Sequence, residues 1–258
     1  MSLERTPDGL EKVWIHISDV SRWVRPTSAL CIEAERRMTS AYFADGVISM
    51  FPPVLSERLL SLRARAESYA LSCGVVLSDK GDIVSYEICP SLIRLSHRIT
   101  YTELDSILNG QTPADALSDV GSAEDLIKLN EWTRLRGAFR KDENFALDSY
   151  LMHKTELSLS VDTTAEQGSE PKTVITTVLK HGDSSSVNLV AECMILMSES
   201  VGDLCGDIGA SVTYKTQRPQ SPFHASNLEP LKGENPYMRS IRIVRYLKGA
   251  MDSKAKGV

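Results

Sequence analysis

Residues 72–88 read SCGVVLSDKGDIVSYEI, in which two apolar stretches flank a short polar one. The stretches Ser72–Leu77 and Ile83–Ile88 have the length and the β-branched content of strands. Between them, Asp79–Asp82 contains a glycine and two aspartates, which are typical turn residues. We therefore predict a β-hairpin here, with further extended chain over Ile93–Ile99.

Outward from this hairpin, strand and helix signals alternate without a regular order. Near the N-terminus Val13, Ile15 and Ile17 alternate with Trp14 and His16, which predicts another strand. The T-x-x-E spacing of Thr100 and Glu103 is a capping box that begins a helix. Helices are predicted over Leu30–Tyr42, Ser56–Leu60 and Tyr101–Leu108, from a cap at Ser122 to an end between Arg140 and Asn144, and over Ser184–Glu199. Paired strands are predicted at Glu156–Val161 and Val174–Leu179. This order lacks the repeated strand-helix-strand units of a doubly wound sheet, so we predict an α+β (mixed α/β) fold.

The composition is that of a globular protein, with 258 residues, 42% of them hydrophobic and 24% charged. No stretch approaches the roughly 18 consecutive apolar residues of a membrane span, and the first 11 residues are polar, which argues against a membrane or secreted protein. Five cysteines, widely spaced and without a C-x-x-C pair, favour neither a disulfide framework nor a zinc site. We interpret them as core residues in a reducing compartment.

The charge is unevenly distributed. The whole chain has a formal net charge of -5, but residues 213–258 carry nine Lys or Arg against three acidic residues. This stretch is either a surface that faces an anion or a solvated basic tail. Sequence motifs do not distinguish these two interpretations, because the chain lacks a P-loop, a dinucleotide-binding glycine motif, H-E-x-x-H and G-x-S-x-G. The five histidines have no metal-ligand spacing, and a hydrogen-bonded strand or surface role is the ordinary one for each.

Several blocks along the chain form a recognisable series. They include VWIHISDVS (13–21), TSAYFAD (39–45), SLIR (91–94), RITY (98–101), LVAECMIL (189–196) and IVRYLKGA (243–250). These blocks resemble the RNB domain of the ribonuclease II/ribonuclease R exoribonucleases, occur in that family's order and span nearly the whole sequence. The form VWIH and the residues 206–209 resemble the plant-organelle and cyanobacterial branch. The resemblance implies an RNB-type catalytic core.

The resemblance also implies a function, the processive 3′ to 5′ hydrolysis of single-stranded RNA to nucleoside 5′-monophosphates with Mg²⁺. DNA and membranes are not expected partners. In the family, aromatic rings stack on the last bases, and Tyr42 and Tyr101 match those tyrosines. Glu192 matches a helix glutamate that contacts the terminal nucleotide. A further aromatic position of the family falls on Ser149, so either the ring is replaced there or the alignment has slipped.

Each matched residue has an ordinary structural alternative. Tyr42 could be a core aromatic at the end of a helix, Tyr101 a residue of a first helical turn, and Glu192 a solvated glutamate beside Asn188. These alternatives require no ligand. The exposure and the contacts of the three side chains distinguish an RNA-binding role from an ordinary structural one.

Two family motifs do not match within the chain. The D-x-D-D run that binds metal would precede Met1, and the T-S-P-I-R-R-Y block would follow Gly257. We therefore expect residues 1–258 to be a partial RNB domain, without the flanking cold-shock and S1 domains, without the metal ligands and the catalytic arginine, and inactive when isolated. The alternative is a non-catalytic pseudo-nuclease that binds RNA or a partner through its basic stretch. The expected compartment is the cytoplasm, or a chloroplast or mitochondrion for the plant branch.

Overall fold

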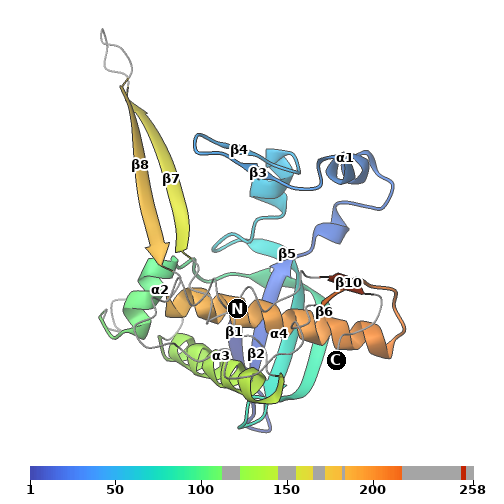
Figure 1. The fold of residues 1–258 in the computed structure, drawn as a ribbon. Helices are drawn as coiled ribbons and strands as arrows, with labels where there is room; N and C mark the ends of the chain where they lie inside the picture. Colours follow the sequence, from blue (N-terminus) through green and yellow to red (C-terminus); the bar gives the residue numbers. More distant parts are fainter. Residues whose placement is uncertain (112–122, 145–154, 165–171, 182–183, 217–250, 254–258) are drawn as a thin grey trace, which may run out of the picture.

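The computed structural model describes residues 1–111, 123–144, 155–164, 172–181, 184–216 and 251–253. Its centre is an antiparallel sheet in the order β1-β2-β5-β6. The strands are β1 (Ser2–Arg5), β2 (Glu11–Ser18), β5 (Glu67–Leu77) and β6 (Ile83–Arg94). The predicted hairpin is thus confirmed as β5 and β6, which are longer than the apolar stretches alone indicate. Three helices, α2 (Tyr101–Leu108), α3 (Ala123–Asn144) and α4 (Ser185–Asp207), pack beside the sheet (Figure 1).

The hydrophobic core lies between this sheet and the helices. Alternate residues of β2 and β5 face inward, and Ile15, Cys73 and Val75 are completely buried. Leu189 and Cys193 of α4 complete the same core, so the predicted apolar stripe of this helix is confirmed. The five cysteines are free thiols, of which two are buried and three are partly exposed. Burial raises the pKa of the Cys193 thiol to about 12.

On the outer face of the sheet, a row of hydrogen bonds crosses all four strands. Ser91 Oγ donates to the carbonyl oxygen of Ala70 at 3.2 Å and lies 2.5 Å from Ser72 Oγ. Ser72 Oγ lies 2.6 Å from Nδ1 of His16, whose Nε2 is 3.1 Å from Ser2 Oγ. Because Ser91 uses its proton on Ala70, Ser72 donates to Ser91 and His16 donates from Nδ1. The row therefore places a proton on Nδ1 of His16.

Residues 19–66 connect β2 to β5 and form a separate projection, which we call the β2–β5 lobe (Figure 1). The lobe contains the short helix η1 (Val20–Arg22), α1 (Ala29–Arg37), the two-residue strands β3 (Ala41–Tyr42) and β4 (Val47–Ile48), and one π-helical turn, η2 (Val54–Leu59). A second hairpin, β7 (Thr155–Thr164) and β8 (Lys172–His181), extends away from the sheet, and β9 (Tyr214–Thr216) pairs with β10 (Met251–Ser253).

Two helices end at residues other than those that the sequence predicts. The helix expected over Leu30–Tyr42 ends at Arg37, because Met38 adopts a left-handed conformation with φ 62° and its N–H caps the carbonyl of Ala34. Tyr42 is therefore in a strand. The helix expected to end at Glu199 continues to Asp207, as α4.

Gly202 and Gly206 lie inside this longer helix, and Gly209 follows its end with φ +65°. A Cβ at Gly202 would lie 3.4 Å from the ring of Tyr214, which is an ordinary van der Waals contact. The Tyr214 hydroxyl donates to the Gly202 carbonyl at 3.0 Å. The predicted cap Ser122, the residue Ser149 and most of the basic stretch 213–258 lie outside the described residues.

Candidate functional site

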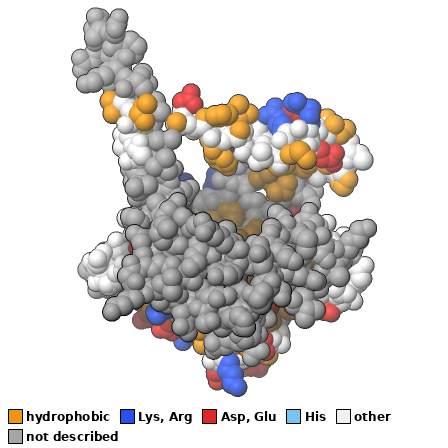
Figure 2. Space-filling view, in the orientation of Figure 1, with side chains coloured by type: hydrophobic (Ala, Val, Ile, Leu, Met, Phe, Trp, Pro, Cys, Tyr) orange, Lys and Arg blue, Asp and Glu red, His pale blue; other side chains and the backbone are white. Residues whose placement is uncertain are grey.

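The two tyrosines that match the family are exposed. Tyr42 is 79% exposed and lies in β3 of the lobe, and Tyr101 is 54% exposed and is the first residue of α2. The alternative in which Tyr42 is a core aromatic is therefore wrong, whereas Tyr101 does lie in a first helical turn. Figure 2 shows that hydrophobic side chains gather over the lobe, and Phe43, Val47 and Ile48 beside Tyr42 are each 58% exposed. Both rings are open to a flat ligand.

Local hydrogen bonds position Tyr101. Thr100 and Glu103 form the predicted capping box, in which Glu103 N donates to Thr100 Oγ1 at 3.3 Å and Thr100 N donates to Glu103 Oε2 at 2.7 Å. The carbonyl oxygen of Tyr101 accepts a hydrogen bond from Ser186 Oγ at 3.0 Å. Because Ser186 belongs to α4, this contact fixes the start of α2 on the start of α4.

Asp105 strengthens the same junction. Its carboxylate accepts from Ser184 Oγ at 2.7 Å and from the Ser186 N–H at 2.9 Å. Burial opposes the ionisation of Asp105, but these hydrogen bonds outweigh burial and lower its pKa. A negative charge at this position also interacts favourably with the N-terminus of α4.

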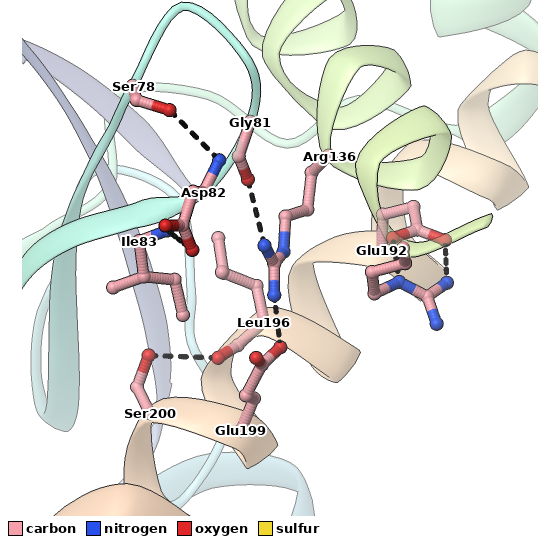
Figure 3. Close-up of polar contacts among 10 residues, drawn as sticks. Ser78, Gly81, Asp82, Ile83, Arg136, Glu192, Leu196, Glu199 and Ser200 are labelled. Atoms are coloured by element: carbon pink, nitrogen blue, oxygen red, sulfur yellow. Dashed lines mark hydrogen bonds and ion pairs between the residues drawn. The ribbon is translucent and has the colours of Figure 1, made fainter. Parts of the chain in front are cut away.

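Glu192 differs sharply from the tyrosines, since it is 1% exposed. Arg140 of α3 donates to both of its carboxylate oxygens, Nη2 to Oε1 at 2.5 Å and Nε to Oε2 at 3.1 Å (Figure 3). The alternative in which Glu192 is solvated is therefore wrong. Its contact with a nucleotide stays a prediction, and such a contact would have to share the carboxylate with Arg140.

A second arginine of α3 joins three elements. Arg136 is 2% exposed, and its Nη1 donates to the Gly81 carbonyl at 2.8 Å, in the turn between β5 and β6. Its Nη2 donates to Glu199 Oε2 of α4 at 2.5 Å (Figure 3). Sequence patterns missed these partners, although the four-residue spacing of Arg136 and Arg140 does place both on one helix face.

The structure thus joins two of the three predicted residues to one framework. Tyr101 is held on α4 by the hydrogen bond from Ser186, and Glu192 is itself a residue of α4. Tyr42 lies on the lobe, which Figure 1 shows apart from α2 and α4. A cavity of about 480 Å³ lies between α3 and the start of α4. Its lining includes Asn130, Arg134 and Asn188. These side chains can hydrogen-bond a polar molecule, but they do not identify a particular ligand.

In the part of the chain that the structure describes, no three His, Cys, Asp or Glu side chains are grouped so that they could hold a metal ion. The described donor set therefore does not fit Mg²⁺. Among the same residues, no helix has the length and hydropathy needed to cross a membrane.

Comparison with known proteins identifies related sequences. The RNB domain family matches residues 1–249. An uncharacterised ribonuclease of Synechocystis is 31% identical over 223 residues, which cover 86% of this chain and 30% of that protein. The chloroplastic/mitochondrial ribonuclease II of Arabidopsis thaliana is 30% identical over 250 residues, covering 97% of this chain and 29% of that protein. The chain thus spans about a third of the length of these relatives or less.

Solved structures share the fold. RNase R of Mycoplasma genitalium in complex with ribose-methylated single-stranded RNA superposes with a TM-score of 0.74 at 20% identity, over 98% of this chain and 42% of that one. Yeast Ssd1, described as a pseudonuclease, gives a TM-score of 0.64 at 14% identity, over 97% of this chain and 32% of that one. The predicted α+β fold is confirmed by these likenesses.

Proposed function

Because this chain belongs to the RNB domain family, we propose that it is part of a 3′ to 5′ exoribonuclease that hydrolyses single-stranded RNA to nucleoside 5′-monophosphates. The family match over residues 1–249 is the observation that carries the proposal. Relatives named ribonuclease II and ribonuclease R support it. The single-stranded RNA bound by the similarly folded RNase R supports RNA as the ligand.

In this proposal the described residues bind RNA. Tyr42 and Tyr101 stack on bases, because their rings are exposed and every base offers a flat face, which makes such binding tolerant of sequence. Glu192 contacts the terminal nucleotide and remains held in orientation by Arg140. The polar framework of α2, α3 and α4 thus supports Tyr101 and Glu192, and the lobe presents Tyr42.

Mg²⁺ would supply the chemistry of hydrolysis by polarising the phosphate and lowering the pKa of a bound water. Since the described donor set does not fit this ion, we assign it no residue and derive no step through it. We propose that residues 1–258 alone bind RNA without hydrolysing it. We further propose that the protein acts in a reducing compartment, either the cytoplasm or an organelle.

A second function is a non-catalytic RNA-binding protein. The likeness of fold to yeast Ssd1, a pseudonuclease, favours it. The first function predicts that the protein that contains this segment releases nucleoside monophosphates, and the second predicts that it does not. They agree that the segment binds single-stranded RNA.

The test measures binding and hydrolysis separately. Fluorescence anisotropy with a labelled oligouridine of about 20 nucleotides gives the Kd of the 258-residue chain, and chromatography of the products detects nucleoside 5′-monophosphates. We expect Y42A to raise the Kd by about 5- to 150-fold, since one base stack is worth about 1–3 kcal/mol. F43A is the matched control, because Phe43 is a neighbouring exposed ring that the family match does not select. Equal effects of Y42A and F43A would contradict the assigned role of Tyr42.

Two further results would revise the proposal. Equal affinity for single-stranded RNA and for single-stranded DNA of the same sequence would contradict a substrate restricted to RNA. Release of nucleoside monophosphates by the 258-residue chain, abolished by a chelator, would contradict the statement that this segment only binds. A protein of endogenous length that binds RNA and releases no monophosphates with Mg²⁺ would establish the pseudonuclease instead.

A further inference from the structure

The inner face of the sheet extends beyond the helices that cover it. Along β5, Val75 and Cys73 are completely buried, but Tyr69, on the same face near the start of the strand, is 38% exposed. Leu92 lies opposite Tyr69 in β6 and is 56% exposed. Ile17 of β2 is 37% exposed at the same end. The sheet therefore presents an uncovered apolar shelf where the chain passes into the lobe.

Arg22 and Trp23 lie over this shelf. The guanidinium carbon of Arg22 is 3.7 Å from the centre of the Tyr69 ring, and the Trp23 ring meets the same tyrosine edge-on, with centres 6.5 Å apart and an interplanar angle of 62°. The backbone holds this arrangement, since Asp19 N donates to the Tyr69 carbonyl at 3.2 Å and Trp23 N donates to the Val20 carbonyl at 3.1 Å.

The stack retains open surface. Arg22 is exposed and Trp23 is 40% exposed. Among the residues that the structure describes, Arg22 has no acidic partner, so its stacking on Tyr69 is not accompanied by an ion pair. A guanidinium over an aromatic ring keeps its N–H groups at its own edge, where they can bind phosphate, while its second face can stack on a base.

The charge of the surrounding lobe favours an anionic ligand. Residues 19–66 contain seven arginines, no lysine and five acidic residues, a formal balance of +2 in a chain whose net charge is -5. Aromatic and arginine side chains also occur in protein interfaces. The positive balance, and a guanidinium without an acidic partner among the described residues, favour a nucleic-acid strand, which offers both phosphates and flat bases.

We propose that Arg22, Trp23 and Tyr69 form a platform that binds one nucleotide of single-stranded RNA, with a base stacked on the platform and a phosphate on the Arg22 guanidinium. This inference rests on the proposed binding of RNA, and it adds a contact that is separate from Tyr42 and Tyr101. The platform lies at the junction of sheet and lobe, so it would hold RNA in register between the two.

The first measurement is tryptophan emission during titration with an oligouridine of about 20 nucleotides, because base stacking quenches indole fluorescence. Wild type is expected to be quenched, and W23F, which keeps a ring and loses the indole, is expected to lose most of the change while it still binds RNA by anisotropy. Quenching of the same size in W23F would overturn the proposal, since the signal would then come from Trp14 or Trp132.

The second measurement compares matched arginine variants. R22A and R25A remove the same charge three residues apart, and both side chains are exposed, but only Arg22 lies on an aromatic ring. We expect R22A to raise the Kd for the oligouridine about 5-fold more than R25A, and R22K to resemble R22A, because lysine keeps the charge without the planar stack. Equal effects of R22A and R25A would reduce Arg22 to a general charge and overturn the platform.

The outcomes also separate this inference from the proposed function. If Y42A weakens binding while W23A and R22A match wild type, the proposed function stands and the platform fails. If no variant and no wild-type protein binds the oligouridine, both fail. Circular dichroism of W23A and R22A, matched against wild type, excludes unfolding as the cause of a lost contact.

Discussion

Arg140 binds both carboxylate oxygens of Glu192 across the interface of α3 and α4, at 2.5 Å and 3.1 Å. Because Glu192 is 1% exposed, R140M would leave a buried carboxylate without its counter-charge. Removal of one partner of a buried pair costs about 3–5 kcal/mol. We expect R140M to lower the free energy of unfolding by about that amount in urea denaturation followed by circular dichroism.

The double variant R140M/E192Q is the control for this prediction. It removes both charges together, so it is expected to be more stable than R140M alone. Were the double variant as unstable as the sum of the two single ones, the two side chains would be energetically independent.

Asp105→Asn tests the junction of α2 and α4. The amide retains one acceptor and loses the charge that faces Ser184 and the Ser186 N–H, so we expect a loss of about 1–2 kcal/mol near neutral pH. The pKa of Asp105 is lowered by folding from its ordinary value of 3.8. Its contribution is therefore complete above that value and is lost as the pH falls through the lower folded pKa. The stability gap between wild type and D105N should narrow over that window, and a constant gap would refute this assignment.

Gly81→Ala is expected to be more harmful than Gly9→Ala. Both glycines have positive φ, +92° and +80°, so an alanine is strained by about 1–2 kcal/mol in either position. Only at Gly81 would the added Cβ meet another group, the Leu135 carbonyl oxygen at 2.8 Å, whereas nothing lies within 4 Å at Gly9. The overpacking adds about 1–3 kcal/mol. The urea midpoints of the two variants measure the difference in stability. Equal midpoints would show that the β5–β6 turn can shift away from Leu135 without a loss of stability.

His16→Gln tests the hydrogen-bonded row across the sheet. Burial lowers the pKa of His16 from 6.5 to about 4 in the folded chain. The unfolded chain therefore binds more protons between these values, and the folded state loses stability as the pH falls from 6.5 towards 4. H16Q removes this titration, so its urea midpoint should fall less than that of wild type over the same range. Parallel curves for the two proteins would assign the acid sensitivity to other groups.

The sequence was most informative where the interactions are local. The capping box of Thr100 and Glu103 needs only four residues, and the β5–β6 hairpin needs only a turn between two apolar stretches. Both were therefore predictable. The α+β class followed from the order of such elements.

Neither the end of α1 nor the interactions between distant residues were predictable in this way. The apolar spacing around Met38 fits a longer helix, but the backbone is left-handed at Met38, and helical periodicity does not predict that conformation. The partners Arg136 and Glu199 are far apart in sequence, as are Arg22 and Tyr69. The family match selected Tyr42 and Tyr101, and only three-dimensional packing reveals that these rings are exposed and that Glu192 is not.

The two ion pairs between α3 and α4 also determine how far one helix can slide along the other. The helices run antiparallel, because Arg136 pairs with Glu199 and the later Arg140 pairs with the earlier Glu192. The arginines are four residues apart and the glutamates seven, about 6 Å and 10.5 Å along a helix axis. A shift by one turn, about 5.4 Å, can therefore bring only one arginine to a glutamate.

A shift that brings Arg140 to Glu199 strands the buried Glu192, and the opposite shift strands Glu199. Either shift thus leaves one glutamate without its arginine, and the loss is more costly at Glu192, which is 1% exposed, than at Glu199, whose side chain is 33% exposed.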